Sequence, residues 1–119
     1  MSRKTKYTPF AVVVGVSRPE DQVRYQEELK GFDVKFPESH SAAVGMLPKA
    51  TVLAVALDQK TFLEKAADRG FTGHIVPIMS GKHQDFFPAK GRRIPAVACR
   101  HAPGEILKHL KKAQAVTQQ

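Results

Sequence analysis

The chain has 119 residues, a hydrophobic fraction of 42% and a formal net charge of +8 at pH 7. This length fits one domain with a core of its own and is too short for two. The positive charge favours acidic partners, whether protein, nucleic acid or anionic lipid, without choosing between them.

The single cysteine, Cys99, excludes an internal disulfide and a paired CxxC motif for metal or redox chemistry. The basic segment 1–9 is followed by an apolar run, 10–14, that is too short for a signal sequence or a membrane span. We therefore expect a cytoplasmic protein with no membrane span.

The first predicted elements are a strand over 10–14 and a helix over 19–30. Ser17 followed by Glu20 has the spacing of a capping box, which predicts the start of the helix. The apolar side of this helix is expected at Val23, Gln26 and Leu29.

Alternating apolar and charged residues over 32–36 predict a half-exposed strand at the edge of a sheet, ended by Pro37. A short helix over 42–47 follows, with Ser39 or Ser41 as its cap.

The run 51–57 is apolar except for its first residue, and Asp58 follows it. A short, continuous run of this kind is typical of a parallel strand buried on both faces. Asp58 would then lie at the carboxyl end of a central strand, which is where open α/β sheets bind their ligands.

A second capping box, Thr61 with Glu64, predicts a helix that Gly70 ends. The apolar run 74–79 predicts a fourth strand, although Pro77 within it counts against full pairing on both sides.

The segment 80–94 shows no clear pattern and predicts a loop or a shortened helix. A fifth strand is expected over 94–99, and Pro103 opens a last helix with apolar residues at helical spacing. The segment 114–119 is expected to be a flexible tail.

Strands that alternate with helices predict a doubly wound, five-stranded parallel sheet with helices as right-handed crossovers. The domain would span 10–113, between a basic flexible tail over 1–9 and the tail over 114–119.

Three features of this pattern resemble the receiver domain of two-component response regulators. They are Asp58 at the end of the third strand, the run Ile78-Met79-Ser80-Gly81 at the end of the fourth, and Pro103-Gly104-Glu105 at the start of the last helix. The resemblance implies a flavodoxin-like topology, with Asp58 as the phosphoryl acceptor and Ser80 as its hydrogen-bonding partner.

Two other positions depart from that family. Gly15 and Val16 stand where receivers carry the acids that hold Mg²⁺, and Cys99 stands where they carry a lysine. Phosphoryl transfer depends on charge neutralisation, so the loss of these groups removes most of the catalysis. The chain therefore resembles a degenerate receiver, a pseudo-receiver, with an incomplete pocket at Asp58, Ser80, Cys99 and Gly15. We expect no catalytic activity, no metal and no cofactor.

Each of these residues also has a purely structural interpretation. Asp58 can cap the helix that follows or be a solvated acid at the end of its strand, and Ser80 can be an ordinary turn residue before Gly81. Cys99 can be a small buried apolar residue. The five histidines lack ligand spacing, which indicates surface positions and not a metal site.

The region after Ser80 is rich in cations and holds an adjacent pair of phenylalanines. In a receiver-like fold this region forms one face, which receivers use for partners. The candidate partner-binding residues are Lys82, Phe86, Phe87, Lys90, Arg92, Arg93, Arg100 and Lys108. The alternative interpretation is a solvated basic surface.

Together these features predict a regulatory module that binds an acidic protein surface independently of phosphorylation. One alternative is a working receiver with Asp58 as the acceptor. Another is a nucleic-acid-binding protein, for which the charge is evidence although no motif is present. The sequence also leaves open whether the protein forms a homodimer.

Overall fold

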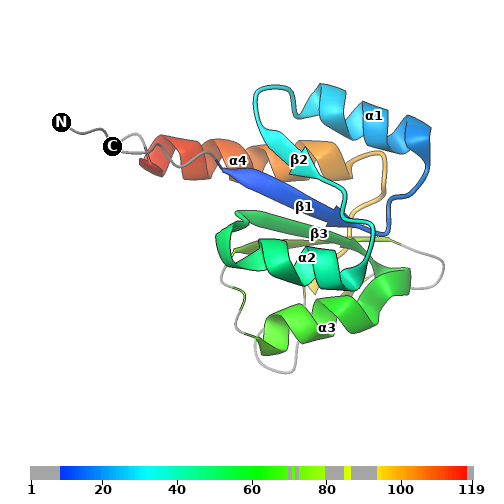
Figure 1. The fold of residues 1–119 in the computed structure, drawn as a ribbon. Helices are drawn as coiled ribbons and strands as arrows, with labels where there is room; N and C mark the ends of the chain where they lie inside the picture. The colour runs from blue at the N-terminus through cyan, green and yellow to red at the C-terminus, as the bar shows by residue number, and fades with distance from the viewer. Residues whose placement is uncertain (1–8, 70, 72, 80–84, 87–93, 118–119) are drawn as a thin grey trace.

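The computed structural model describes residues 9–69, 71, 73–79, 85–86 and 94–117 (Figure 1). Its centre is a parallel sheet of four strands in the order β2-β1-β3-β4. The four strands are β1 (Phe10–Val14), β2 (Asp33–Lys35), β3 (Val52–Ala56) and β4 (His74–Ile78). The helices are α1 (Pro19–Glu28), α2 (His40–Met46), α3 (Lys60–Asp68) and α4 (Ala102–Thr117), with short 3-10 turns η1 (Leu47–Lys49) and η2 (Leu57–Gln59).

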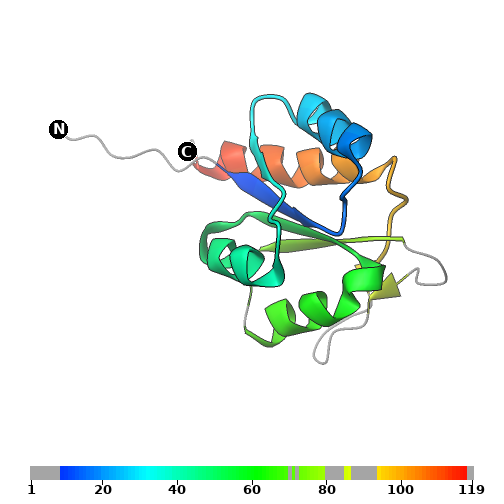
Figure 2. The same cartoon turned by 45° about the vertical axis from the view of Figure 1, so that its right-hand side comes forward.

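Helices cover both faces of the sheet (Figure 2). Alternate residues of a strand point to opposite faces, so Ala11 and Val13 pack with α1 and α4, whereas Val12 and Val14 pack with α2 and α3. β3 is buried along its whole length, as its unbroken apolar run predicts. The two apolar layers are what hold the sheet and its helices together.

The strand order reverses between β1 and β3. The chain leaves β1 for α1 and β2 on one side, then returns through α2 to β3 on the other side of β1. The predicted edge strand, β2, does lie at an edge of the sheet, and both of its charged residues are exposed. The carboxyl ends of β1 and β3 therefore meet at the reversal, where an open α/β sheet forms a crevice.

Pro77 lies within β4 without weakening its pairing to β3. The amide of His74 donates to Thr51 of the β3 side (3.0 Å), while the carbonyl of Pro77 accepts from Val97 on the opposite side (2.9 Å). Alternate residues of a parallel strand direct their peptide groups to opposite neighbours. The missing N–H of Pro77 therefore falls on the outer side of β4, and no bond to β3 is lost.

The fifth strand predicted over 94–99 is much shorter than expected. Ile94–Pro95 form β6, which pairs antiparallel with β5 (Asp85–Phe86) outside the main sheet. Val97 then makes a single parallel bridge with Ile78 beside β4. Pro95 cannot donate a hydrogen bond, and a turn begins at Cys99, so little extended backbone is left for a ladder. Most of the segment 80–93, expected to be a loop or a shortened helix, lies outside the described residues.

The buried side of α1 also differs from the prediction. Tyr25 is buried, as is Leu29 one turn later, whereas Val23 is 51% exposed. The apolar side expected from the sequence did not include Tyr25. A buried tyrosine needs a polar partner for its hydroxyl. The backbone of Cys99 supplies that partner, so the apolar side is rotated away from Val23.

Neither predicted capping box forms. The N-cap residue of α1 is Arg18 and that of α3 is Gln59, and neither side chain caps its helix. The carbonyl of Arg18 instead accepts from the amides of Asp21 and Gln22, both at 3.0 Å. The prediction for α2 is confirmed, because Ser39 accepts from the amide of Ala42 at 3.1 Å.

The last helix is longer than the sequence predicts. α4 continues through Thr117, into the segment 114–119 that was expected to be a tail. None of the helices in the described part of the chain is long and apolar enough to cross a membrane.

Candidate functional site

A pocket of about 440 Å³ lies at the carboxyl ends of β1 and β3, where the strand order reverses. Three segments build it: the turn after β1, the loop after β2, and η2 after β3. Its polar lining residues include Gly15, Ser17, Gln22, Glu38, Ser39, His40, Asp58 and Gln59. The topology of the sheet therefore brings together Gly15 and Asp58, two of the four candidate pocket residues.

Gly15 has a structural reason to lack a side chain. Its φ of +94° is a conformation that L-residues rarely adopt. A Cβ at Gly15 would lie 2.7 Å from the Cβ of Ala56 and 3.2 Å from Cγ of Gln59. The close approach of the first turn to the end of β3 therefore excludes an acidic side chain at this position.

Asp58 lies in η2, beyond the end of β3, and is exposed. The N-cap residue of α3 is Gln59, so Asp58 is not the cap residue of that helix. Its exposure fits the other structural interpretation, a solvated acid after the end of a strand. An exposed carboxylate at this place can accept hydrogen bonds or bind a cation.

Hydrogen bonds fix the walls of this pocket. Nε2 of His40 lies 2.9 Å from Oε1 of Gln59, which joins α2 to η2. Nε2 of Gln22 donates to the carbonyl of Val16 at 2.8 Å and holds the turn after β1 against α1. Sequence reasoning did not single out His40, Gln22 or Gln59. The sequence feature that points to His40 is its position shortly after the second strand, since residues that follow the strands of an open α/β sheet lie at its ligand-binding edge.

The described part of the lining does not suit a phosphoryl group. Of the described lining residues, Glu38 and Asp58 are acids and none is a lysine or an arginine. A phosphoryl group carries negative charge and needs cations or several amide donors for its stabilisation. Within the described residues, no three His, Cys, Asp or Glu side chains are arranged to hold a metal ion.

Cys99 is not one of the described lining residues. It is half-buried and packs against the apolar layer beneath α1 and α4. The hydroxyl of Tyr25 donates to its carbonyl at 3.0 Å and lies 3.3 Å from its Sγ. The apolar surroundings agree with the structural interpretation of Cys99, although its side chain is half-buried and not fully buried. The fourth candidate, Ser80, lies outside the described residues.

The candidate partner-binding residues are only partly described. Lys82, Phe87, Lys90, Arg92 and Arg93 lie outside the described residues. Phe86 belongs to β5, where it pairs with Ile94. Arg100 and Lys108 are exposed. The carbonyl of Arg100 accepts from Nη2 of Arg24 at 2.6 Å, which links the middle of α1 to the turn before α4.

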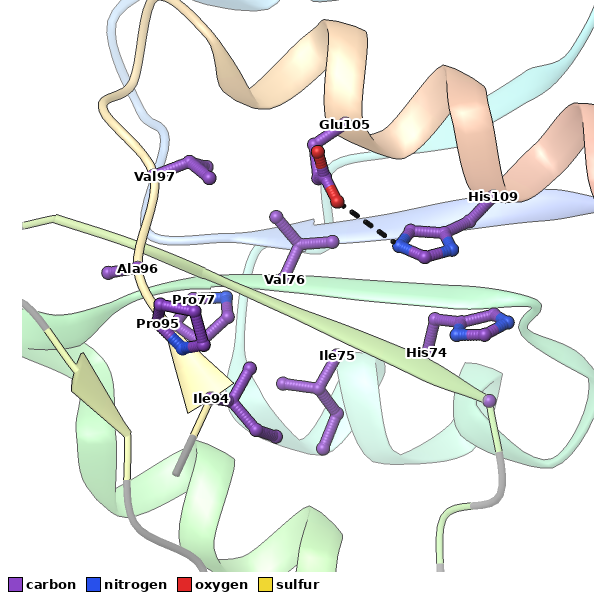
Figure 3. A pocket seen from close by; sticks show the side chains of 11 residues that line it. His74, Ile75, Val76, Pro77, Ile94, Pro95, Ala96, Val97, Glu105 and His109 are labelled. Atoms are coloured by element: carbon purple, nitrogen blue, oxygen red, sulfur yellow. Dashed lines mark ion pairs between the residues drawn. The ribbon is translucent and has the colours of Figure 1, made fainter. Parts of the chain in front are cut away.

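A second pocket, of about 550 Å³, lies between β4, the segment 94–97 and α4 (Figure 3). Its polar end is formed by His74 and His109, whose rings stack at a centroid distance of 4.1 Å, and by Glu105. Nε2 of His109 lies 3.4 Å from Oε2 of Glu105. No sequence pattern indicated this pocket, because His74 and His109 are distant along the chain and show no ligand spacing.

Comparisons with protein-family models, with curated proteins and with solved structures found no match to this chain. The function of the protein must therefore be inferred from the geometry of the two pockets and of the charged surface around α4.

Proposed function

We propose that this protein is a regulatory module of the pseudo-receiver type, which binds an acidic protein partner independently of phosphorylation. The interface is the basic surface, defined here as Arg100, Lys108, Lys111 and Lys112. The candidate residues Lys90, Arg92 and Arg93, which precede β6 in the sequence, are proposed to contribute to the same interface. The observation that carries the proposal is the exposure of the four side chains that define the basic surface, on α4 and the turn before it.

The charge balance of α4 supports an acidic partner. Its only acid is Glu105, whose carboxylate lies 3.3 Å from Nζ of Lys108 and 3.4 Å from Nε2 of His109. Lys111 and Lys112 are exposed and strengthen the positive potential. Exposed cations of this kind accelerate encounter with an acidic surface and favour it over neutral ones.

The pocket at the carboxyl ends of β1 and β3 supports independence from phosphorylation. Gly15 stands where a metal-binding acid would be needed, and the contact with Ala56 leaves no room for one. The described lining also contains no cation that could pair with a phosphoryl group.

The position of Val97 supports a receiver-like topology. Its amide donates to the carbonyl of Pro77 at 2.9 Å, and its carbonyl accepts from the amide of Met79 at 2.8 Å. We infer that Val97 marks the place of a fifth parallel strand, which would complete the doubly wound sheet of the flavodoxin-like fold.

The test is capture of the partner from an extract of the source cells on the immobilised protein. We expect wild type to retain a specific acidic protein. The double variant Arg100→Glu with Lys108→Glu should lose it. The matched control is Lys65→Glu with Arg69→Glu, which makes the same change of net charge on exposed residues of α3 and the turn after it, on the other side of the sheet.

Two additions to the same experiment separate the other candidate functions. Nuclease treatment should leave the retained protein unchanged, whereas a nucleic-acid-mediated contact would disappear. Beryllofluoride with Mg²⁺ should also have no effect. A retained protein that depends on beryllofluoride would overturn independence from phosphorylation.

A further inference from the structure

We propose that the pocket between β4 and α4 is a strand-addition site, in which an extended acidic segment of the partner pairs with the open edge of β4 at Ile75. This inference rests on the proposed function, since it names how the acidic partner is held. Two separate features support it: the direction of the backbone groups of β4 and the position of the pocket.

Among the described residues, β4 has backbone groups on its outer side that no partner satisfies. Pro77 and Met79 direct their peptide groups outward, where Val97 pairs with both. Ile75 belongs to the same alternating set, so its N–H and C=O also face outward. No described residue pairs with Ile75 on that side, because the neighbouring segment makes only the bridge at Val97.

The second pocket lies along the same stretch of β4. Its lining contains Gly73 to Pro77 from the strand side and Ile94 to Val97 from the neighbouring segment. Figure 3 shows Val97 and Pro95 at one end of the pocket, near Pro77, and His74 at the other. A segment that entered here would therefore lie beside Ile75. It would occupy the outer side of β4, next to the place where Val97 pairs with that strand.

The two sides of the pocket differ in chemistry. Ile75 and Ile94 belong to the apolar layer beneath α2 and α3, while Glu105 and His109 project from α4 on the other side (Figure 3). The side chains of an added strand alternate between these two sides. A segment with apolar residues at every second position would thus direct them towards Ile75 and Ile94.

The α4 side favours acids at the intervening positions. The carboxylate of Glu105 is shared by Lys108 and His109, and Lys112 lies near enough to act on His109 electrostatically. Lys108 and Lys112 are both exposed. Lys108 and Lys112 are not among the described lining residues, and Nζ of Lys108 lies 3.3 Å from the carboxylate of Glu105, the acid of the lining. In strand addition the main chain supplies hydrogen bonds and alternate side chains supply specificity. An alternating apolar and acidic segment would pair with Ile75, direct its apolar residues towards Ile75 and Ile94, and turn its acids towards α4, where these two lysines are exposed.

A metal ion is a poorer occupant of this pocket. The lone pairs of an imidazole lie in the plane of its ring, and the rings of His74 and His109 are nearly parallel, at 17°. Two stacked rings cannot direct their lone pairs at one ion between them.

The probe is a capped five-residue peptide of alternating valine and aspartate, followed by titration of the amide spectrum of the whole protein. We expect saturable shifts at residues 73–77, at Val97 and along α4. The same peptide with lysine in place of aspartate should bind at least tenfold more weakly.

The decisive comparison is Ile75→Pro with Ile75→Ala. Both variants lose the isoleucine side chain, but only proline loses the outward N–H. Proline at this position preserves the bonds to β3 for the same reason that Pro77 does. The peptide should bind Ile75→Pro at least tenfold more weakly than Ile75→Ala.

The possible failures of the two proposals are distinguishable. Equal binding to Ile75→Pro and Ile75→Ala, together with loss of binding in Lys108→Glu, would overturn strand addition while supporting an acidic partner at the basic surface. Equal binding of the aspartate and lysine peptides, both lost in Ile75→Pro, would support pairing at β4 and overturn the acidic partner. Absence of binding by the aspartate peptide at millimolar concentration would overturn the strand-addition site.

Discussion

The hydroxyl of Tyr25 lies 3.0 Å from the carbonyl oxygen of Cys99 and donates a hydrogen bond to it. This contact joins the buried side of α1 to the segment that leads into α4. Burial, followed by the hydrogen bond to Cys99, raises the pKa of Tyr25, so the phenol stays protonated and keeps its proton for donation. The contact therefore fixes the position of the turn that carries Arg100, and with it one end of the basic surface.

Replacement of Tyr25 by phenylalanine is expected to lower the free energy of unfolding by about 1 kcal/mol, since the ring is retained and one hydrogen bond is lost. Urea denaturation followed by circular dichroism measures this change. Cys99→Ala keeps the carbonyl acceptor and should cost less than Tyr25→Phe. A larger effect of Cys99→Ala would show that the thiol, and not the carbonyl, makes the important contact.

Replacement of Gly15 by alanine is expected to be costlier than replacement of Gly31, although both glycines have a positive φ. Gly31→Ala has nothing within 4 Å of the new Cβ and should lose about 1 kcal/mol from backbone strain alone. Gly15→Ala adds the contact with Ala56 and should lose at least about 2 kcal/mol. Equal losses in the denaturation curves would contradict the steric exclusion of an acid at Gly15.

Asp58→Asn is expected to change the free energy of unfolding by less than about 0.5 kcal/mol, because Asp58 is exposed and is not the cap residue of α3. Beryllofluoride with Mg²⁺ should leave the amide spectrum of the wild-type protein unchanged. Shifts that cluster at Asp58 and Gly15, and that vanish in Asp58→Asn, would instead support a working phosphorylation site.

His109 is expected to make the protein less stable as the pH falls below neutrality. Burial, followed by the neighbouring His74, lowers the pKa of His109, and Lys108 and Lys112 lower it further. Glu105 raises the pKa, but its effect is smaller than the others combined. In the unfolded chain His109 regains its ordinary pKa near 6.5 and therefore binds a proton first. Stability is thus greatest above about pH 6.5 and is lost as the pH falls towards the lowered pKa of the folded state.

Urea denaturation at several pH values between about 7.5 and 5 checks this expectation. His109→Phe keeps a flat ring beside His74 and should reduce the loss of stability at acidic pH. His101→Gln, at an exposed position, is the matched control. The same dependence on pH in wild type and His109→Phe would assign the effect to other groups.

The strands β1, β3 and β4 could be predicted from the sequence because their apolar runs are short and bounded by turn residues. The run before Asp58 identified β3 as the central strand, and alternation over 32–36 identified β2 as an edge. The position of Asp58 at a carboxyl end also led to the pocket at the reversal of strand order.

The remaining features depend on contacts between distant residues. The partner of Tyr25 is the backbone of Cys99, and no local pattern reports a main-chain acceptor so far along the chain. The stack of His74 on His109 likewise arises only when α4 packs beside β4. The sequence alone indicates that Pro77 interrupts the pairing of its strand. Only the sheet shows that the peptide groups of Pro77 face away from β3.

The affinity of the purified partner for the basic surface tests the central proposal most directly. Titrations at two salt concentrations would compare wild type, the double variant Arg100→Glu with Lys108→Glu, and the control Lys65→Glu with Arg69→Glu, with circular dichroism to verify folding. We expect the first variant to weaken binding at least tenfold and the control to change it by less than about threefold. The difference in affinity between wild type and the first variant should be smaller at high salt, because salt screens exposed charges. Equal weakening by both variants, or weakening by the control alone, would contradict an interface at the basic surface.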